Sequence, residues 1–266
     1  MAYRQYEWIF DNSIETDIVY AGRYGAKGEK RTPRRKATPE QVKRQNQRNK
    51  EIRMRRLIKA NFKEGDLWAT LKYSEGIRKE VKDVQADLSR FLRKLRTEYK
   101  KLHVPLKFIY RIELGRQGGI HTHILVNRVP DADRIMQRLW IHGRVNWTST
   151  YECGGFKSLA EYIVKEPEEI DGQMSLFDEP DRGKLIKYSS SRNLVRPEPV
   201  KKEYSRRTVR KILRDGPKPH EGFYIDKDSV VIGVNQYTGY SYIHYTETRI
   251  KRKQKGGSDA ACEYLC

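Results

Sequence analysis

Residues 110–127 read YRIELGRQGGIHTHILVN, in which two stretches of alternating apolar and polar residues flank a glycine-rich connection. This pattern predicts two antiparallel strands, Lys107–Leu114 and Ile120–Asn127, joined as a hairpin at GRQGG. Ahead of the hairpin, the alternating residues 67–73 predict another strand. Apolar residues three and four positions apart predict a long amphipathic helix from Ile77 to Leu102.

Further elements are expected on both sides of this region. They are a helix beginning at Thr38-Pro39, helices at Asp131–Trp140, Ser158–Glu166 and Tyr204–Leu213, a strand at Arg144–Trp147 and a hairpin at Ser229–Tyr245. Helices and strands that mix without regular βαβ alternation indicate an α+β fold with an antiparallel sheet. The expected regions are a basic N-terminal arm and helix at 1–60, a central domain at 61–200 with an acidic loop at 168–182, a C-terminal helix and hairpin extension at 201–250, and a disordered tail at 251–266.

The composition indicates a polyanionic partner. The 266 residues include 55 Lys and Arg against 35 Asp and Glu, a formal net charge of +20, together with 17 Tyr, 7 Phe and 4 Trp. Lys and Arg release condensed counterions when they bind phosphates, and this many aromatic residues can form a core, so we expect a folded nucleic-acid-binding protein. Arg34 and Arg35 in the basic arm are candidate DNA contacts. Charge alone leaves ribosomal, structural and enzymatic roles open.

Neither membrane insertion nor a disulfide framework is expected. No apolar run approaches the roughly 18 residues that a membrane span needs, and the N-terminus lacks a signal-peptide pattern, so we expect a soluble cytoplasmic protein. Cys153, Cys262 and Cys266 are scattered and show no C-x-x-C spacing. This spacing indicates neither paired disulfides nor a zinc site built from thiolates.

The hairpin brings together three candidate metal ligands. On a strand, His121 and His123 lie on the same face. If Glu113 is paired with His121, or with His123 after a shift of two residues, its carboxylate faces both imidazoles, whereas a shift of one residue turns it away. Two imidazoles and one carboxylate suit Mn²⁺ or Mg²⁺, and Zn²⁺ is also open. The alternative is a pair of solvated histidines without a metal.

A candidate nucleophile lies further along the chain. In LAEYIVK, residues 159–165, the helical period places Tyr162 and Lys165 on one face. A tyrosine hydroxyl that attacks a phosphodiester needs its developing charge stabilised, which a nearby lysine and a metal ion can do. The alternative is a core tyrosine beside a surface lysine.

The order of these segments resembles the HUH endonuclease superfamily, and more narrowly the rolling-circle replication initiator proteins of bacterial phages and plasmids. The resemblance runs from about residue 46 to residue 194. It rests on ANFKEGDLWATLKY, YRIELGRQGGIHTHILVN, HGRVN, SLAEYIVKE and KYSSSRNLVRP.

The resemblance implies a ferredoxin-like, RRM-like antiparallel sheet with helices on one face. It also implies that His121, His123 and Glu113 hold a metal ion beside the scissile phosphate. Tyr162 would then attack, leaving a 5′-phosphotyrosine and a free 3′-hydroxyl, while Lys165 would orient the phosphate.

The chain departs from the family pattern in two places. Thr122 stands between the histidines, where the family prefers a bulky apolar residue. No second tyrosine lies one helical turn from Tyr162, so the resemblance implies an enzyme with a single catalytic tyrosine. A GxxxxGK[ST] motif is also absent from the sequence, so we expect a separate host helicase to unwind the DNA.

Other segments suggest further contacts. Expected DNA contacts also include Arg111, Ser189, Ser191 and Arg192, whose hydroxyl and guanidinium groups can bind phosphate. In the acidic loop, residues 173–177 read QMSLF and resemble the peptide by which bacterial replication proteins bind the sliding clamp. Gln173, Leu176 and Phe177 would be its anchors. The alternative is a loop that folds its own Leu and Phe onto the domain.

The leading hypothesis is therefore metal-dependent nicking and joining of single-stranded DNA at a replication origin, which initiates rolling-circle replication. A non-catalytic protein that binds single-stranded nucleic acid is a second hypothesis, and zinc-dependent hydrolysis is a third. A transposase or conjugative relaxase would share the chemistry of the first.

Overall fold

The protein forms two units in the computed structural model, which describes residues 3–22, 37–115, 119–150, 156–165, 188–235 and 239–250. We call Ala37–Pro197 the central unit. The terminal unit joins both ends of the chain, Met1–Lys36 and Glu198–Cys266. This division differs from the expected boundaries at 60 and 200, because the first residues of the chain pair as strands with the C-terminal hairpin.

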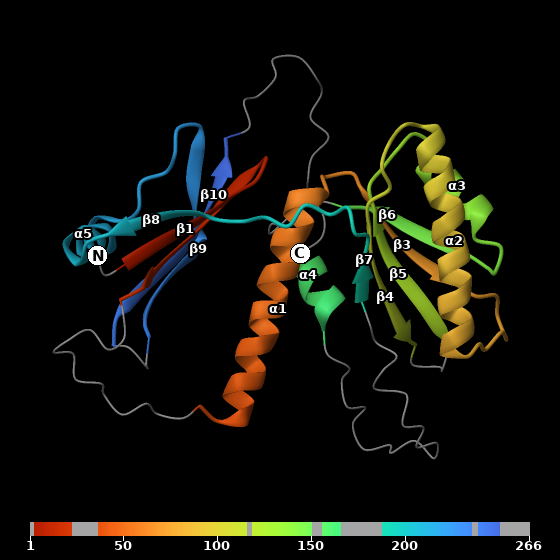
Figure 1. The fold of residues 1–266 in the computed structure, drawn as a ribbon, viewed down its shortest axis with the longest axis horizontal. Coiled ribbons are helices and arrows are strands. Elements are labelled where there is room, and N and C mark those ends of the chain that lie inside the picture. Colours follow the sequence, from red (N-terminus) through yellow and green to blue (C-terminus); the bar gives the residue numbers. More distant parts are fainter. Residues whose placement is uncertain are drawn as a thin grey trace. The chain divides into compact units, whose positions relative to one another are not determined.

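The central unit holds a five-stranded antiparallel sheet with four helices (Figure 1). Its elements are α1 (Pro39–Asn61), β3 (Leu67–Lys72), α2 (Val81–Lys101), β4 (Phe108–Leu114), β5 (Ile120–Val126), α3 (Ala132–Leu139), β6 (Val145–Ser149), α4 (Lys157–Val164) and β7 (Tyr188–Ser190). The strand order is β6-β3-β5-β4-β7. The α+β class is confirmed, and the elements expected in this unit are present within a few residues of their expected bounds. The largest difference is at Ile77, which lies ahead of α2 and is exposed.

Helices cover both faces of the central sheet rather than the one face expected. On one face, α2 and α3 pack against a core that includes Ile112 and Ile124. On the other, α1 and α4 pack against Ile109 and Leu125. Adjacent strands β4 and β5 carry apolar residues on both sides, so each face needs a cover. The second face matters for function because it places α4 over the hairpin that carries the candidate ligands.

Helix α1 begins where the sequence indicated. Thr38 is its N-cap: the Thr38 hydroxyl accepts from the Gln41 amide at 3.3 Å, and the Gln41 side chain accepts from the Thr38 amide at 3.0 Å. This reciprocal pair satisfies two backbone donors that a helix start leaves open. Near the other end, the buried Met54 and Ile58 pack in the same core as α4. Helix α1 therefore supports α4 from outside the sheet.

The terminal unit is a second five-stranded antiparallel sheet, in the order β8-β1-β2-β10-β9. Its elements are β1 (Tyr3–Ile9), β2 (Ser13–Tyr20), β8 (Val200–Tyr204), α5 (Arg206–Asp215), β9 (Phe223–Val234) and β10 (Ser241–Arg249). The expected C-terminal helix and hairpin are present as α5 and β9–β10. Strands β1 and β2 were not expected. Val209 of α5 packs with Tyr3, Ile18 and Ile243 in this unit's own core.

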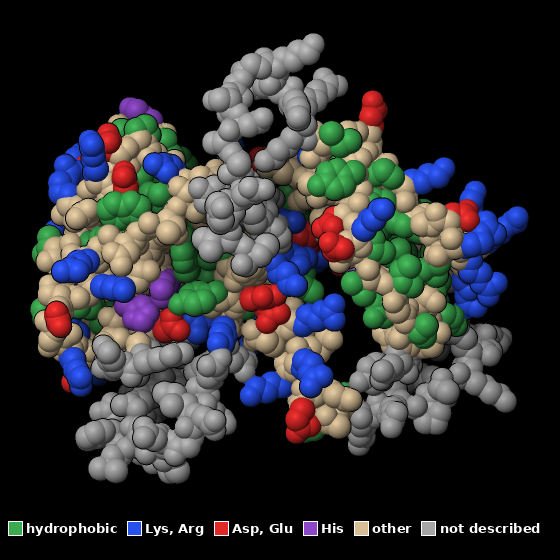
Figure 2. All heavy atoms as spheres, turned by 180° about the vertical axis from the view of Figure 1, so that it is seen from behind, with side chains coloured by type: hydrophobic (Ala, Val, Ile, Leu, Met, Phe, Trp, Pro, Cys, Tyr) green, Lys and Arg blue, Asp and Glu red, His purple; other side chains and the backbone are tan. Residues whose placement is uncertain are grey.

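Lys and Arg side chains appear over much of the surface in the view from behind (Figure 2). This distribution agrees with the net charge of +20. Within the described ranges, no helix has the length and hydropathy needed to cross a bilayer.

Candidate functional site

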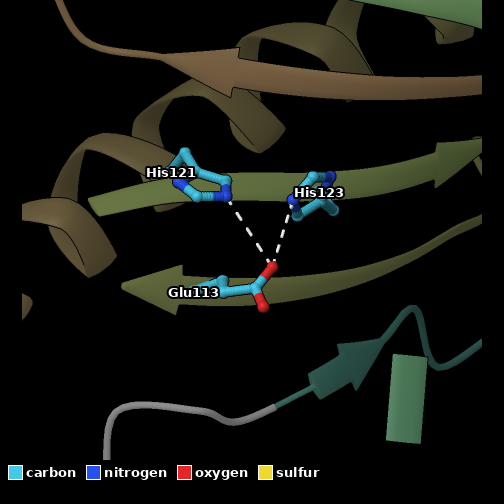
Figure 3. A group of neighbouring side chains, drawn as sticks. All are labelled: Glu113, His121 and His123. Carbon is cyan, nitrogen blue, oxygen red and sulfur yellow. Dashed lines mark ion pairs between the residues drawn. The ribbon is translucent and has the colours of Figure 1, made fainter. Parts of the chain in front are cut away.

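The β4–β5 hairpin brings the three candidate metal ligands together (Figure 3). Glu113 is paired with His121 across the hairpin, the first of the two registers considered from the sequence. Glu113 Oε2 lies 3.7 Å from His121 Nε2 and 3.3 Å from His123 Nε2. One ligand atom from each residue falls within 4.8 Å of the others, so the triad can hold a metal ion.

The electrostatics of the triad fit a cation. Burial lowers the pKa of His121, and burial with the neighbouring His121 ring lowers the pKa of His123 to about 4. Both rings are therefore neutral at pH 7, the form that offers a nitrogen lone pair to a metal. Glu113 adds one negative charge. A nitrogen and oxygen donor set of this kind is compatible with several divalent ions and does not by itself select one.

Strand β3 orients the His123 ring. Thr70 is paired with His123 across β3 and β5, and Thr70 Oγ1 lies 3.1 Å from His123 Nδ1. The Trp68 ring stacks on the same imidazole, with centroids 5.6 Å apart and planes 12° apart. Together these contacts hold Nε2 toward Glu113, as partners of ligand histidines commonly do. Neither Thr70 nor Trp68 was identified from the sequence as a site residue.

Helix α4 brings the Tyr162 hydroxyl to the triad. The hydroxyl lies 2.5 Å from Glu113 Oε2, to which it donates, and 2.8 Å from His123 Nε2. The Tyr162 ring meets Trp68 edge to face at 5.9 Å. Burial, followed by the hydrogen bond to Glu113, raises the pKa of Tyr162 well above its usual range. The phenol is therefore neutral in this arrangement, and it must lose its proton during any attack on phosphorus.

Residues 66–167 match the model of a family of replication-associated proteins, the ORF2 type. The matched residues contain Glu113, His121, His123 and Tyr162, and they end shortly after α4. The match supports a replication role and nucleic-acid binding for this chain. Comparisons with curated proteins and with solved structures give no match.

Arg111 does not lie where a DNA contact was expected. Its side chain is buried, with 3% of the residue exposed, and Nη1 lies 3.1, 2.9 and 2.6 Å from the carbonyl oxygens of Tyr162, Ile163 and Lys165. The guanidinium also lies 5.8 Å from the centroid of the Tyr162 ring. Arg111 therefore caps the carbonyl end of α4, where positive charge is favourable, and holds the backbone that carries Tyr162. Burial lowers the pKa of Arg111.

Lys165 is the C-cap of α4 rather than part of the helix. The helix ends at Val164, so the helical spacing expected to align Lys165 with Tyr162 stops one residue too early. The Lys165 side chain is exposed, and its backbone carbonyl accepts from Arg111.

The serine-rich segment divides into structural and exposed residues. The buried Ser191 accepts from the Phe108 amide at 3.1 Å, and its own amide donates to the Phe108 carbonyl at 2.9 Å. Ser191 therefore ties the segment to β4 instead of facing a ligand as expected. Ser189 and Arg192 are exposed. The remaining expected contacts lie outside the described residues: Arg34, Arg35, Gln173, Leu176 and Phe177.

Proposed function

We propose that the protein nicks and rejoins single-stranded DNA at a replication origin and thereby initiates rolling-circle replication. One observation carries the proposal: the Tyr162 hydroxyl lies within hydrogen-bond distance of two candidate metal ligands, Glu113 and His123. A structural tyrosine needs one partner for its hydroxyl, whereas this one meets a carboxylate and an imidazole beside a possible cation site. The match to a replication-associated family supports the biological role.

In the proposed reaction, Tyr162 Oη attacks the scissile phosphorus. A bond forms between Oη and phosphorus, and the bond between phosphorus and the 3′-oxygen breaks. The hydroxyl proton leaves along the hydrogen bond to Glu113, and the 3′-oxygen takes up a proton to become a 3′-hydroxyl. Attack by a 3′-hydroxyl on the phosphotyrosine reverses these steps and reseals the strand without ATP.

The proposed ion is Mn²⁺ or Mg²⁺, and Glu113, His121 and His123 would hold it. When bound, such an ion supplies positive charge for the phosphate oxygens. Arg111 positions the nucleophile through α4, and Thr70 with Trp68 positions the His123 ring. Lys165, exposed at the end of α4, is proposed to contact the phosphate.

A labelled-strand assay tests this function. The protein is incubated with Mn²⁺ and single strands of random sequence labelled at the 3′ end, because the fragment bearing the 5′-phosphate is the one that stays on the tyrosine. We expect a labelled, protease-sensitive band on a denaturing gel, absent in Tyr162→Phe and present in the control Tyr188→Phe. Tyr188 lies on edge strand β7, opposite Arg111, and is 45% exposed. Tight binding without any adduct would favour a non-catalytic binder, and free 5′-phosphate ends from Tyr162→Phe would favour metal-dependent hydrolysis.

Two partners remain proposals from the sequence alone. The segment 173–177 is proposed to bind a bacterial sliding clamp, and a separate helicase is proposed to unwind the duplex. Replacing Leu176 and Phe177 with Ala should abolish capture of purified clamp while leaving adduct formation unchanged. Unchanged clamp capture would remove this partner from the proposal.

A further inference from the structure

A pocket of about 800 Å³ lies between the end of α2 and the residues that follow β7. Three cations line it: Arg96 and Lys100 come from α2, and Arg192 comes from a segment nearly a hundred residues later. The apolar residues Leu106 and Phe108 also line it, 5% and 6% exposed respectively. None of the described residues that line the pocket is acidic. The fold thus gathers positive charge over an apolar base.

Backbone hydrogen bonds fix the walls of this pocket. The Asn193 side chain donates to the Leu106 carbonyl at 3.0 Å, and Phe108 and Ser191 exchange two bonds through their amides. The segment that carries Arg192 is therefore fastened to the start of β4. A site that is formed before binding loses less conformational entropy when a ligand enters.

The cations of the pocket differ from other cations on α2. Lys101 lies 2.7 Å from Glu98, and Arg90 lies 3.2 Å from Asp87, so each of those charges is partly neutralised. Within the described ranges, no ion pair joins Arg96, Lys100 or Arg192 to a carboxylate. Exposed cations held together without a compensating acid attract phosphates.

We infer that this pocket binds the phosphates of the DNA single strand on one side of the nick. The inference rests on the proposed function, and it adds α2 to the residues that contact DNA. Strand β4 leads from Phe108 in the pocket to Glu113 at the metal triad, about 17 Å at the usual rise of a strand. Phe108 and Glu113 lie on opposite faces of the sheet. The DNA therefore passes around edge strand β7 between the two positions.

Binding of a fluorescent oligo(dT) strand by the full chain, measured without metal over a range of salt concentrations, tests the pocket. The test variant is R96Q/K100Q/R192Q. The control variant, K82Q/R93Q/K94Q, removes the same charge from exposed positions of α2 that do not line the pocket. For the test variant we expect the slope of log K against log salt to fall by about 2, because each phosphate contact on a single strand contributes roughly 0.7. We also expect affinity to fall at least tenfold at low salt, against less than threefold for the control.

The dependence on strand length distinguishes a pocket from general charge. The loss should disappear with strands too short to extend from the triad to the pocket. Equal weakening of both variants, or a loss that is the same for short and long strands, would overturn the inference. Because this assay needs no cleavage, a pocket effect without any Tyr162 adduct would reject the proposed function and retain the pocket. An adduct without a pocket effect would do the reverse.

Discussion

Replacing Arg111 with Met should loosen the end of α4 and displace the Tyr162 hydroxyl. Nη1 carries two hydrogens, so it can serve two of the three carbonyl oxygens within 3.1 Å at one time. Losing the donor for a buried carbonyl costs about 1.5 kcal/mol, so two carbonyls give about 3 kcal/mol of local stability. Because 1.36 kcal/mol is a factor of ten, hydrogen exchange of the α4 amides should accelerate roughly 10²-fold.

The same change should slow adduct formation by about 10²-fold, because a displacement of about 1 Å in a reacting group has an effect of that size. Arg111→Lys is the matched variant. Its ammonium keeps the charge and can donate to part of the same carbonyl cluster, so exchange and rate should both lie between the wild type and Arg111→Met. Unchanged exchange in α4 together with weaker DNA binding would refute this reasoning and restore Arg111 as a DNA contact.

Three further outcomes follow from the triad. Thr70→Val should lower the affinity for Mn²⁺ about tenfold by calorimetric titration, while Thr70→Ser retains it, because the hydroxyl orients His123; equal affinities would exclude that role. The pKa of His123 is about 4 in the folded chain against an ordinary 6.5, so the unfolded chain takes up the proton first as pH falls. Lowering the pH from 7.5 to 5 should therefore reduce the free energy of unfolding of the central unit by about 2 kcal/mol through this residue. Urea unfolding of His123→Gln should lack that part of the loss, and an identical loss would contradict the assignment. Tyr162→Phe should bind Mn²⁺ a few-fold more tightly, because the hydroxyl bonds to atoms of Glu113 and His123 that the ion needs; weaker binding would show that the hydroxyl helps to hold the ion.

The triad could be predicted from the sequence because its geometry is local. A strand period of two places His121 and His123 on one face, and the short hairpin places Glu113 opposite His121. The contact of Tyr162 with the triad was expected from the family resemblance, because no local pattern relates a helix to a strand about fifty residues earlier.

The terminal sheet was missed because its signals are long-range and partly polar. In β1 the inward residues include Gln5 and Glu7, each 4% exposed, so the strand lacks the apolar alternation that would reveal it. Its neighbour β2 pairs with β10, as Ile18 with Ile243, more than two hundred residues away. A local pattern carries no information about such a partner.

The role of Arg111 was also beyond the sequence, for a different reason. Strand alternation correctly places Arg111 on the same face as His123. Whether an arginine on that face meets a phosphate or a backbone carbonyl depends on what covers it. Here α4 covers it, and the helix end supplies three carbonyl oxygens.

Mass spectrometry of the DNA-linked peptide gives the most direct measurement. After reaction with Mn²⁺ and digestion of the DNA, trypsin should release Ser158–Lys165, SLAEYIVK, in which Tyr162 is the sole tyrosine. We predict that this peptide carries a nucleotide joined through a 5′-phosphate to Tyr162, and that Glu113→Gln greatly reduces its yield. Nucleotide found on another residue, or cleaved DNA with no modified peptide, would contradict nicking by Tyr162.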